Sequence, residues 1–98
     1  MNQQTQLHTG TTVSNGLARR MPATSALLVA YLGPDGGTAT CSVWGRAATG
    51  APLRKLWEAV LSGANDSADY LLEGEPWYEL QGRISAISSA TATIAAGV

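Results

Sequence analysis

Five carboxylates within residues 66–79 are the side chains best placed to do chemistry in this sequence. Two carboxylates held about 5–9.5 Å apart can hydrolyse a glycosidic bond. Asn65, Asp66 and Asp69 also offer oxygen ligands of the kind that calcium prefers. A solvated acidic edge that discourages unwanted strand pairing is the simpler interpretation, and we adopt it. The five residues are Asp66, Asp69, Glu73, Glu75 and Glu79.

The other candidates for catalysis lack the neighbours that catalysis needs. His8 is the only histidine, and the polar segment around it offers no group to orient a catalytic base. Cys41 is the only cysteine, which excludes an intrachain disulfide and predicts a small, buried thiol. The glycine-rich residues 33–37 lack the Lys-Ser/Thr pair of a phosphate loop and predict a turn. We therefore predict no enzyme, no catalytic residue, no metal site and no cofactor.

The aromatic and basic residues point to contacts rather than to reactions. Trp44, Trp57 and Trp77 could form a platform on which sugars stack, but such residues more often anchor a core or an interface. Arg19 and Arg20 form an adjacent basic pair, and we expect them to be solvated or to contact a neighbouring carboxylate. Charged residues make up 13% of the chain and its net charge is −1. Without a basic stripe, nucleic acid is not an expected partner.

The sequence also indicates where the protein is made. Its longest apolar run, residues 26–32, is far short of the roughly 20 residues that cross a bilayer. Its first residues, Met-Asn-Gln-Gln-Thr, lack the charged and apolar regions of a secretory signal. We expect no membrane contact, and we expect maturation in the cytoplasm of the cell that produces the protein.

Short apolar runs alternate with turn signals along most of the chain. Residues 25–32 predict a buried strand that ends at the turn 33–37. Residues 38–46 alternate, with Ala39, Cys41 and Val43 on one face.

The last third of the chain carries the clearest strand pattern. Residues 77–88 and 90–98 both alternate, and the pair Ser88-Ser89 between them predicts a hairpin. Short strands with turns every eight to twelve residues predict a β-sandwich or a barrel. The residues that the first strand should direct inward are Tyr78, Leu80, Gly82, Ile84 and Ala86.

One segment fits two structures. Residues 52–63 begin with Pro52, end with Gly63, and repeat apolar residues at helical spacing. The period and the end residues favour an amphipathic helix over a strand. The apolar positions are Leu53, Leu56, Trp57, Val60 and Leu61.

Residues 1–24 differ from the rest in carrying very few large apolar residues. Such a segment cannot repay its own ordering entropy by burial, so we expect an extended N-terminal arm that another subunit holds in place. The remaining residues, 25–98, form the folded domain. They contain no Phe and much Ala and Gly, so the isolated monomer should be weak and self-association is expected. The large apolar residues of the arm are Leu7, Val13, Leu17 and Met21.

Residues 39–98 resemble a group of small β-sandwich proteins found in tailed-phage virions. The resemblance rests on a Trp-containing strand that closes on Leu61-Ser62-Gly63 and on an acidic residue before Pro76-Trp77. It also rests on the run 82–88, which leads into a final strand of alternating Thr and Ala. The resemblance implies an all-β sandwich or jelly-roll-like domain in which residues 53–61 form a strand. It further implies a virion protein such as a capsid decoration or cement protein.

These observations combine into one hypothesis. The chain bridges coat subunits of a capsid as a homodimer or homotrimer, and its arm binds the major capsid protein or another virion protein. Two alternatives stay open: a tail or head–tail connector component, and a carbohydrate-binding sandwich that uses its tryptophans. The residues expected to bind the partner are Leu7, Val13, Leu17, Arg19, Arg20 and Met21.

Overall fold

The structure, a computed structural model, describes residues 4–20, 26–46, 48, 50–72 and 79–97. Within these ranges the regular structure is entirely β, as predicted, and there is no helix. The strands are β1 (Gln4–Gly10), β2 (Ser14–Asn15), β3 (Arg19–Arg20), β4 (Ala26–Leu32), β5 (Thr38–Arg46), β6 (Arg54–Ser62), β7 (Ser67–Leu72), β8 (Glu79–Ser88) and β9 (Ala92–Gly97).

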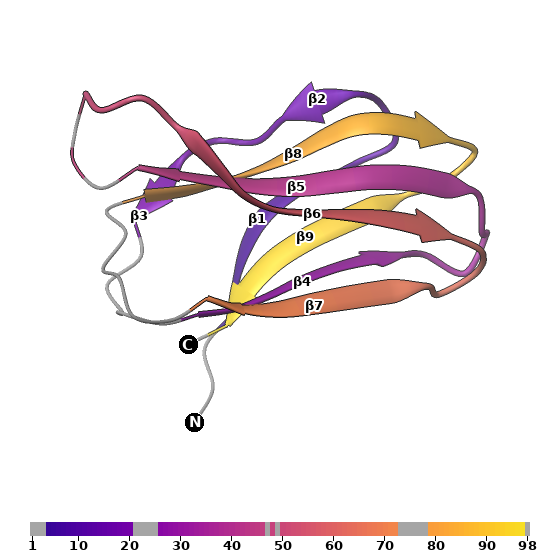
Figure 1. Ribbon diagram of the computed structural model, residues 1–98. Coiled ribbons are helices and arrows are strands. Elements are labelled where there is room, and N and C mark those ends of the chain that lie inside the picture. The colour runs from indigo at the N-terminus through magenta and orange to yellow at the C-terminus, as the bar shows by residue number, and fades with distance from the viewer. Residues whose placement is uncertain (1–3, 21–25, 47, 49, 73–78, 98) are drawn as a thin grey trace.

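The strands form two antiparallel sheets packed face to face (Figure 1). Sheet A has the order β1-β9-β4-β7, and sheet B has the order β2-β8-β5-β6, with β3 also paired to β8. The edge strands β6 and β7 lie on the same side of the sandwich, which faces the viewer in Figure 1. The leading residues close the opposite side, because β1 belongs to sheet A and β2 and β3 belong to sheet B.

Alternation along the strands builds the core between the sheets. Ala39, Cys41 and Val43 are buried on the inner face of β5, as the sequence predicts. Strand β4 contributes Leu28, Ala30 and Leu32 from the facing sheet. Because successive side chains point to opposite faces of a strand, every second residue enters the core.

Residues 54–62 form strand β6 rather than the helix that their spacing favours, so the strand implied by the phage resemblance is confirmed. Ala59 and Leu61 face the core, and β6 pairs with β5 along most of its length. The register with β5 shifts near Leu56, where one extra residue interrupts the alternation. This shift leaves Leu56 and Trp57 both partly buried, and adjacent apolar residues of that kind imitate a helical period.

The hairpin predicted for the end of the chain is wrong. Strand β8 lies in sheet B, whereas β9 lies in sheet A between β1 and β4. The intervening turn therefore carries the chain across the sandwich, with Ser89 at φ 53°. A Cβ at Gly37 would stand 2.3 Å from the carbonyl oxygen of Ser89, so a side chain there would collide with this crossing.

The inward face predicted for β8 holds only up to a bulge. Leu80, Gly82 and Ile84 are buried, but Ala86 is exposed. The register with β5 shifts by one residue at this point, so Ser85 is the additional residue and the alternation changes phase. As a result Ile87, rather than Ala86, packs against the core. Tyr78 lies outside the described residues.

The leading residues do not form a separate arm in the described range. Residues 4–10 pair with β9, and Leu7 is 2% exposed in the core. Pairing with β9 satisfies the backbone of this polar strand, so it does not need many apolar side chains of its own. Glycines make the close approach possible: a Cβ at Gly82 would lie 3.1 Å from Cβ of Leu7, and one at Gly16 would lie 2.4 Å from its carbonyl oxygen.

Candidate interaction surfaces

The residues predicted to bind a partner differ in their exposure. Leu7 is buried in the chain's own core, so it is not available to another protein, and that prediction is wrong. Val13 and Leu17 are 64% and 73% exposed. Arg19 and Arg20 are exposed on β3, and Met21 lies outside the described residues.

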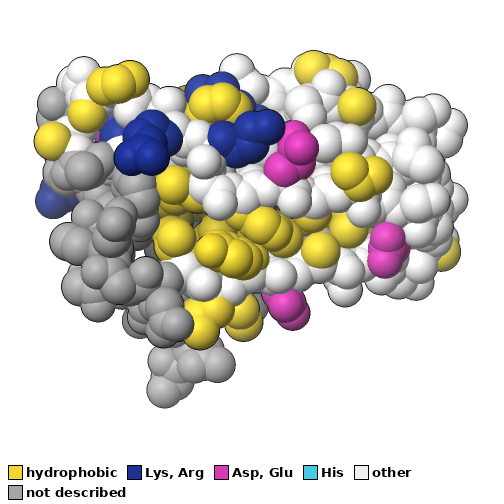
Figure 2. Space-filling view, viewed as in Figure 1, with side chains coloured by type: hydrophobic (Ala, Val, Ile, Leu, Met, Phe, Trp, Pro, Cys, Tyr) yellow, Lys and Arg dark blue, Asp and Glu magenta, His cyan; other side chains and the backbone are white. Residues whose placement is uncertain are grey.

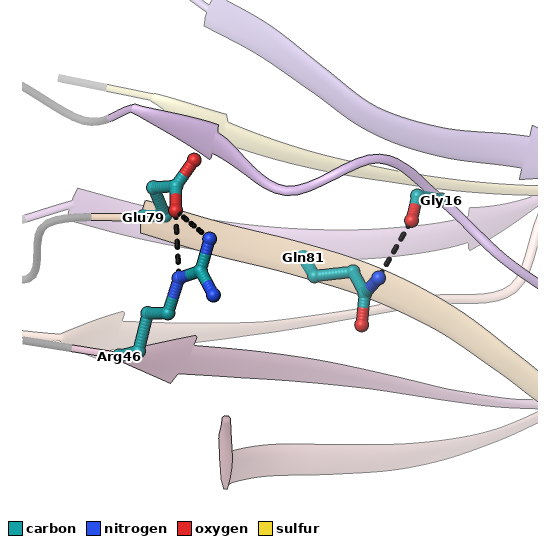
Figure 3. Close-up of polar contacts among 4 residues, drawn as sticks. All are labelled: Gly16, Arg46, Glu79 and Gln81. Atoms are coloured by element: carbon teal, nitrogen blue, oxygen red, sulfur yellow. Dashed lines mark hydrogen bonds and ion pairs between the residues drawn. The ribbon is translucent and has the colours of Figure 1, made fainter. Parts of the chain in front are cut away.

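Local hydrogen bonds hold the segment that carries Val13 and Leu17. The Gln81 side chain donates to the carbonyl oxygen of Gly16 at 2.7 Å (Figure 3), and the Gly16 amide donates to the carbonyl oxygen of Gly82 at 2.8 Å. His8 Nε2 lies 2.7 Å from the hydroxyl oxygen of Ser14. These bonds tie the segment to both sheets.

An open hollow lies between β1 and this segment. Its volume is about 250 Å³. Its surface is more polar than apolar and includes one guanidinium, that of Arg19. The lining residues are Gln6, Leu7, His8, Thr9, Asn15, Gly16, Leu17 and Arg19.

Cationic residues are confined to sheet B. All six Lys and Arg residues of the chain lie on β3, β5, β6 and β8. The strands of sheet A, in contrast, carry one charged residue, Asp69. The two outer faces of the sandwich therefore differ, one being basic and the other nearly uncharged. The cationic residues are Arg19, Arg20, Arg46, Arg54, Lys55 and Arg83.

Carboxylates pair with Arg46 and Lys55. Arg46 Nε donates to Glu79 Oε1 at 2.7 Å, and a second guanidinium nitrogen contacts the same oxygen (Figure 3). Lys55 and Glu58 form an exposed pair at 3.2 Å. Exposed pairs of the second kind contribute about 0–1 kcal/mol.

The two described tryptophans, Trp44 and Trp57, each contact another side chain of the same chain. The guanidinium carbon of Arg83 lies 4.1 Å from the centroid of the Trp44 ring, which makes this a cation–π contact. Trp57 stacks on Tyr70 with centroids 6.3 Å apart and an interplanar angle of 14°. Trp77 lies outside the described residues. The two described tryptophans thus have different partners, Arg83 for Trp44 and Tyr70 for Trp57.

The carboxylates of residues 66–79 do not come together in the described part of the chain. Asp66 accepts hydrogen bonds from the backbone amides of Ser62 and Ser67 at 2.8 and 3.0 Å, so it organises its own turn. Glu79 pairs with Arg46 as described above. Among the described residues no group of His, Cys, Asp and Glu is arranged to hold a metal. Glu73 and Glu75 lie outside these residues.

Cys41 is fully buried. Burial raises the pKa of its thiol from 9.0 to about 11, because desolvation penalises the thiolate. The thiol therefore serves as a small apolar core residue, as predicted. No helix among the described residues is long and apolar enough to cross a membrane.

Two exposed apolar surfaces were not predicted from the sequence. The outer face of sheet A exposes Leu27, Tyr31 and Leu71 by 43–53%. Hydrophobic side chains are also exposed between the edge strands β6 and β7 (Figure 2). The continuous apolar run of β4 is the signal for the first surface, because such runs are typical of strands covered on both faces.

Comparisons with known proteins agree with the fold. No protein-family model matches the sequence, and no curated protein matches it. The crystal structure of the SPBc2 prophage-derived protein YomS is similar to this structure, with a TM-score of 0.62. The match has 9% sequence identity and covers 100% of this chain and 94% of that one. It establishes a shared all-β sandwich architecture over the whole chain.

Proposed function

We propose that the chain is a structural protein of a tailed-phage particle, and specifically a decoration or cement protein that binds coat subunits. The observation that carries this proposal is the sandwich shared over the whole chain with a prophage-derived protein. The sequence resemblance of residues 39–98 to small virion sandwiches supports the same assignment. On this proposal the chain acts by binding and not by catalysis.

The surface formed by the leading residues is the proposed contact with the coat. Val13 and Leu17 project from a segment that Gln81 and Gly82 hold in place, so binding costs little ordering entropy. Arg19, at the rim of the neighbouring hollow, can meet an acidic group and orient the encounter. Burying the exposed part of each apolar side chain should contribute about 1–2 kcal/mol.

Particle composition tests the assignment. We would purify particles from the phage or lysogen that encodes the chain and count this chain and the coat protein by quantitative mass spectrometry. A copy number comparable to that of the coat protein is expected. Absence from the particle would contradict a virion role, and a few copies per particle would assign the chain to the tail or the head–tail connector instead.

Paired variants test the contact surface. Purified Val13→Asp and Leu17→Asp proteins should bind particles lacking the chain about fivefold to thirtyfold more weakly than the unmodified protein. Val60→Asp is the matched control, because Val60 is 76% exposed on the outer face of sheet B. Equal losses in all three variants would show that the leading residues are not the contact.

A further inference from the structure

The side of the sandwich between β6 and β7 is open. Figure 2 shows hydrophobic side chains gathered there, beneath the Lys and Arg side chains of sheet B. Tyr70 is 45% exposed, and Trp57 stacks on it across the gap between the sheets. We call this surface the open side; its apolar residues are Leu56, Trp57, Ala68, Tyr70 and Leu72.

The strand edges of the sandwich differ in how well they could accept another strand. The register of β1 is broken between Gln6 and His8, and β2 and β3 are two residues long. Strand β6 is broken near Leu56. Strand β7, in contrast, pairs with β4 without interruption over six residues and contains no Pro, Lys or Arg. Its one charged residue is Asp69, so the acidic edge expected from the sequence is reduced to a single carboxylate on this strand. Since proteins protect exposed edges with such features, β7 is the least protected of the described edges.

We propose that a second copy of this chain covers the open side, related to the first by a two-fold axis that passes beside Trp57 and Tyr70. The axis stands perpendicular to the sheets. It therefore makes β7 run antiparallel to β7 of the second copy and continues sheet A across the interface. The two apolar surfaces then face each other and are buried together.

The charge on β7 selects the register of this pairing. A two-fold axis at Tyr70 sets Tyr70 opposite the same residue of the second copy and Asp69 opposite Leu71. Moving the axis to Asp69 would set two carboxylates directly opposite each other, which is destabilising. With the axis at Tyr70, each Asp69 instead lies opposite the apolar Leu71 of the other copy. The exposed Leu71 side chains then lie on the outer face of the continued sheet.

The charges on β6 complement one another under the same rotation. Arg54 and Lys55 precede Trp57 along the strand, and Glu58 follows it. The two β6 edges approach in opposite directions, so the basic end of each lies toward Glu58 of the other. Lys55 and Glu58 are 46% and 43% exposed, so both can reach across. This complementarity favours a second copy over an unrelated strand.

This inference gives a surface to the self-association expected from the sequence, and it can fail separately from the proposed function. A dimer that is absent from virions would refute the virion role alone. A monomer that binds particles would refute the dimer alone.

Light scattering on the full-length protein after size exclusion is the first test. The chain has a mass of 10.1 kDa, and a species of twice that mass is expected at micromolar to millimolar concentration. Leu71→Asp should shift the protein to the monomer, because it sets the new carboxylate opposite Asp69 of the second copy. Leu17→Asp, the same change at a leucine far from the open side, should leave the dimer intact. Circular dichroism verifies that both variants are folded. A monomeric unmodified protein, or a dimer that Leu17→Asp disrupts and Leu71→Asp spares, would overturn the proposal.

A crosslink tests the register directly and does not depend on a loss of folding. Residues directly opposite in antiparallel strands have Cα atoms about 4.5–5.5 Å apart, which suits a disulfide. Tyr70→Cys should therefore form a covalent dimer under mild oxidation, while Leu17→Cys should not. Cys41 is buried and should stay unlinked in both variants. A Tyr70→Cys protein that remains uncrosslinked at dimer-forming concentration would overturn the proposed axis.

Discussion

Replacing Leu7 by alanine should destabilise the protein strongly, although Leu7 lies in the most polar part of the sequence. Leu7 is 2% exposed and contacts the core between the sheets. Truncating a fully buried leucine to alanine costs about 2–5 kcal/mol, through the lost transfer free energy and the cavity that remains. Small domains have only about 5–15 kcal/mol of total stability, so this one side chain carries a large share.

Urea denaturation followed by tryptophan fluorescence measures this effect. The midpoint should fall while the slope stays unchanged, and a loss of about 3 kcal/mol should lower Tm by roughly 12–24 °C. Leu17→Ala is the control: Leu17 is 73% exposed, and its truncation should change stability by no more than about 0.5 kcal/mol. If Leu7→Ala behaves like Leu17→Ala, the leading segment does not belong to the sandwich.

Three further predictions concern packing and titration. Gly82→Ala should cost about 1–3 kcal/mol in urea denaturation, because the new Cβ would lie 3.1 Å from Cβ of Leu7; unchanged stability would contradict the close packing. The Cys41 thiol has its pKa raised from 9.0 to about 11, so its contribution to stability is complete below pH 9 and is lost as the pH rises toward about 11. The free energy of unfolding should therefore fall more steeply over that range in the unmodified protein than in Cys41→Ala, and parallel curves would refute the shift. Asp66→Ala should cost about 1 kcal/mol, because it leaves two backbone amides of its turn without their acceptor; a variant as stable as the unmodified protein would show that water replaces the carboxylate.

Strands with an uninterrupted period could be predicted well from the sequence. Residues 38–46 match β5 at both ends, because their alternation continues without a break and a glycine turn precedes them. Residues 54–62 could not be assigned locally. The break in register near Leu56 shifts the alternation there, and only pairing with β5 shows that the segment is a strand.

The leading residues show where local sequence fails. Strand β1 contains one large apolar residue, Leu7, and its stability comes from pairing with β9 at the far end of the chain. Burial estimates on the segment alone omit this contribution. One signal was available: Gly82 interrupts an otherwise well-patterned strand, and a glycine there often marks the close approach of another backbone. In the structure Leu7, His8 and Gly16 make this close approach to Gly82.

The interaction surfaces were only partly accessible from sequence. The exposure of Val13 and Leu17 agrees with their polar surroundings. The open side depends on which strands become edges, and this follows from the order of strands in each sheet. The hairpin expected at Ser88-Ser89 would have given a different order, because it would have placed β9 beside β8.

Electron cryomicroscopy of particles from the encoding phage tests the central claim most directly, by comparison with particles from a deletion mutant. The account predicts two-layered density on the capsid exterior that the mutant lacks, with the Val13 and Leu17 surface against a coat subunit and the open side against a second copy. Identical capsid density in the two particles would contradict the proposed role.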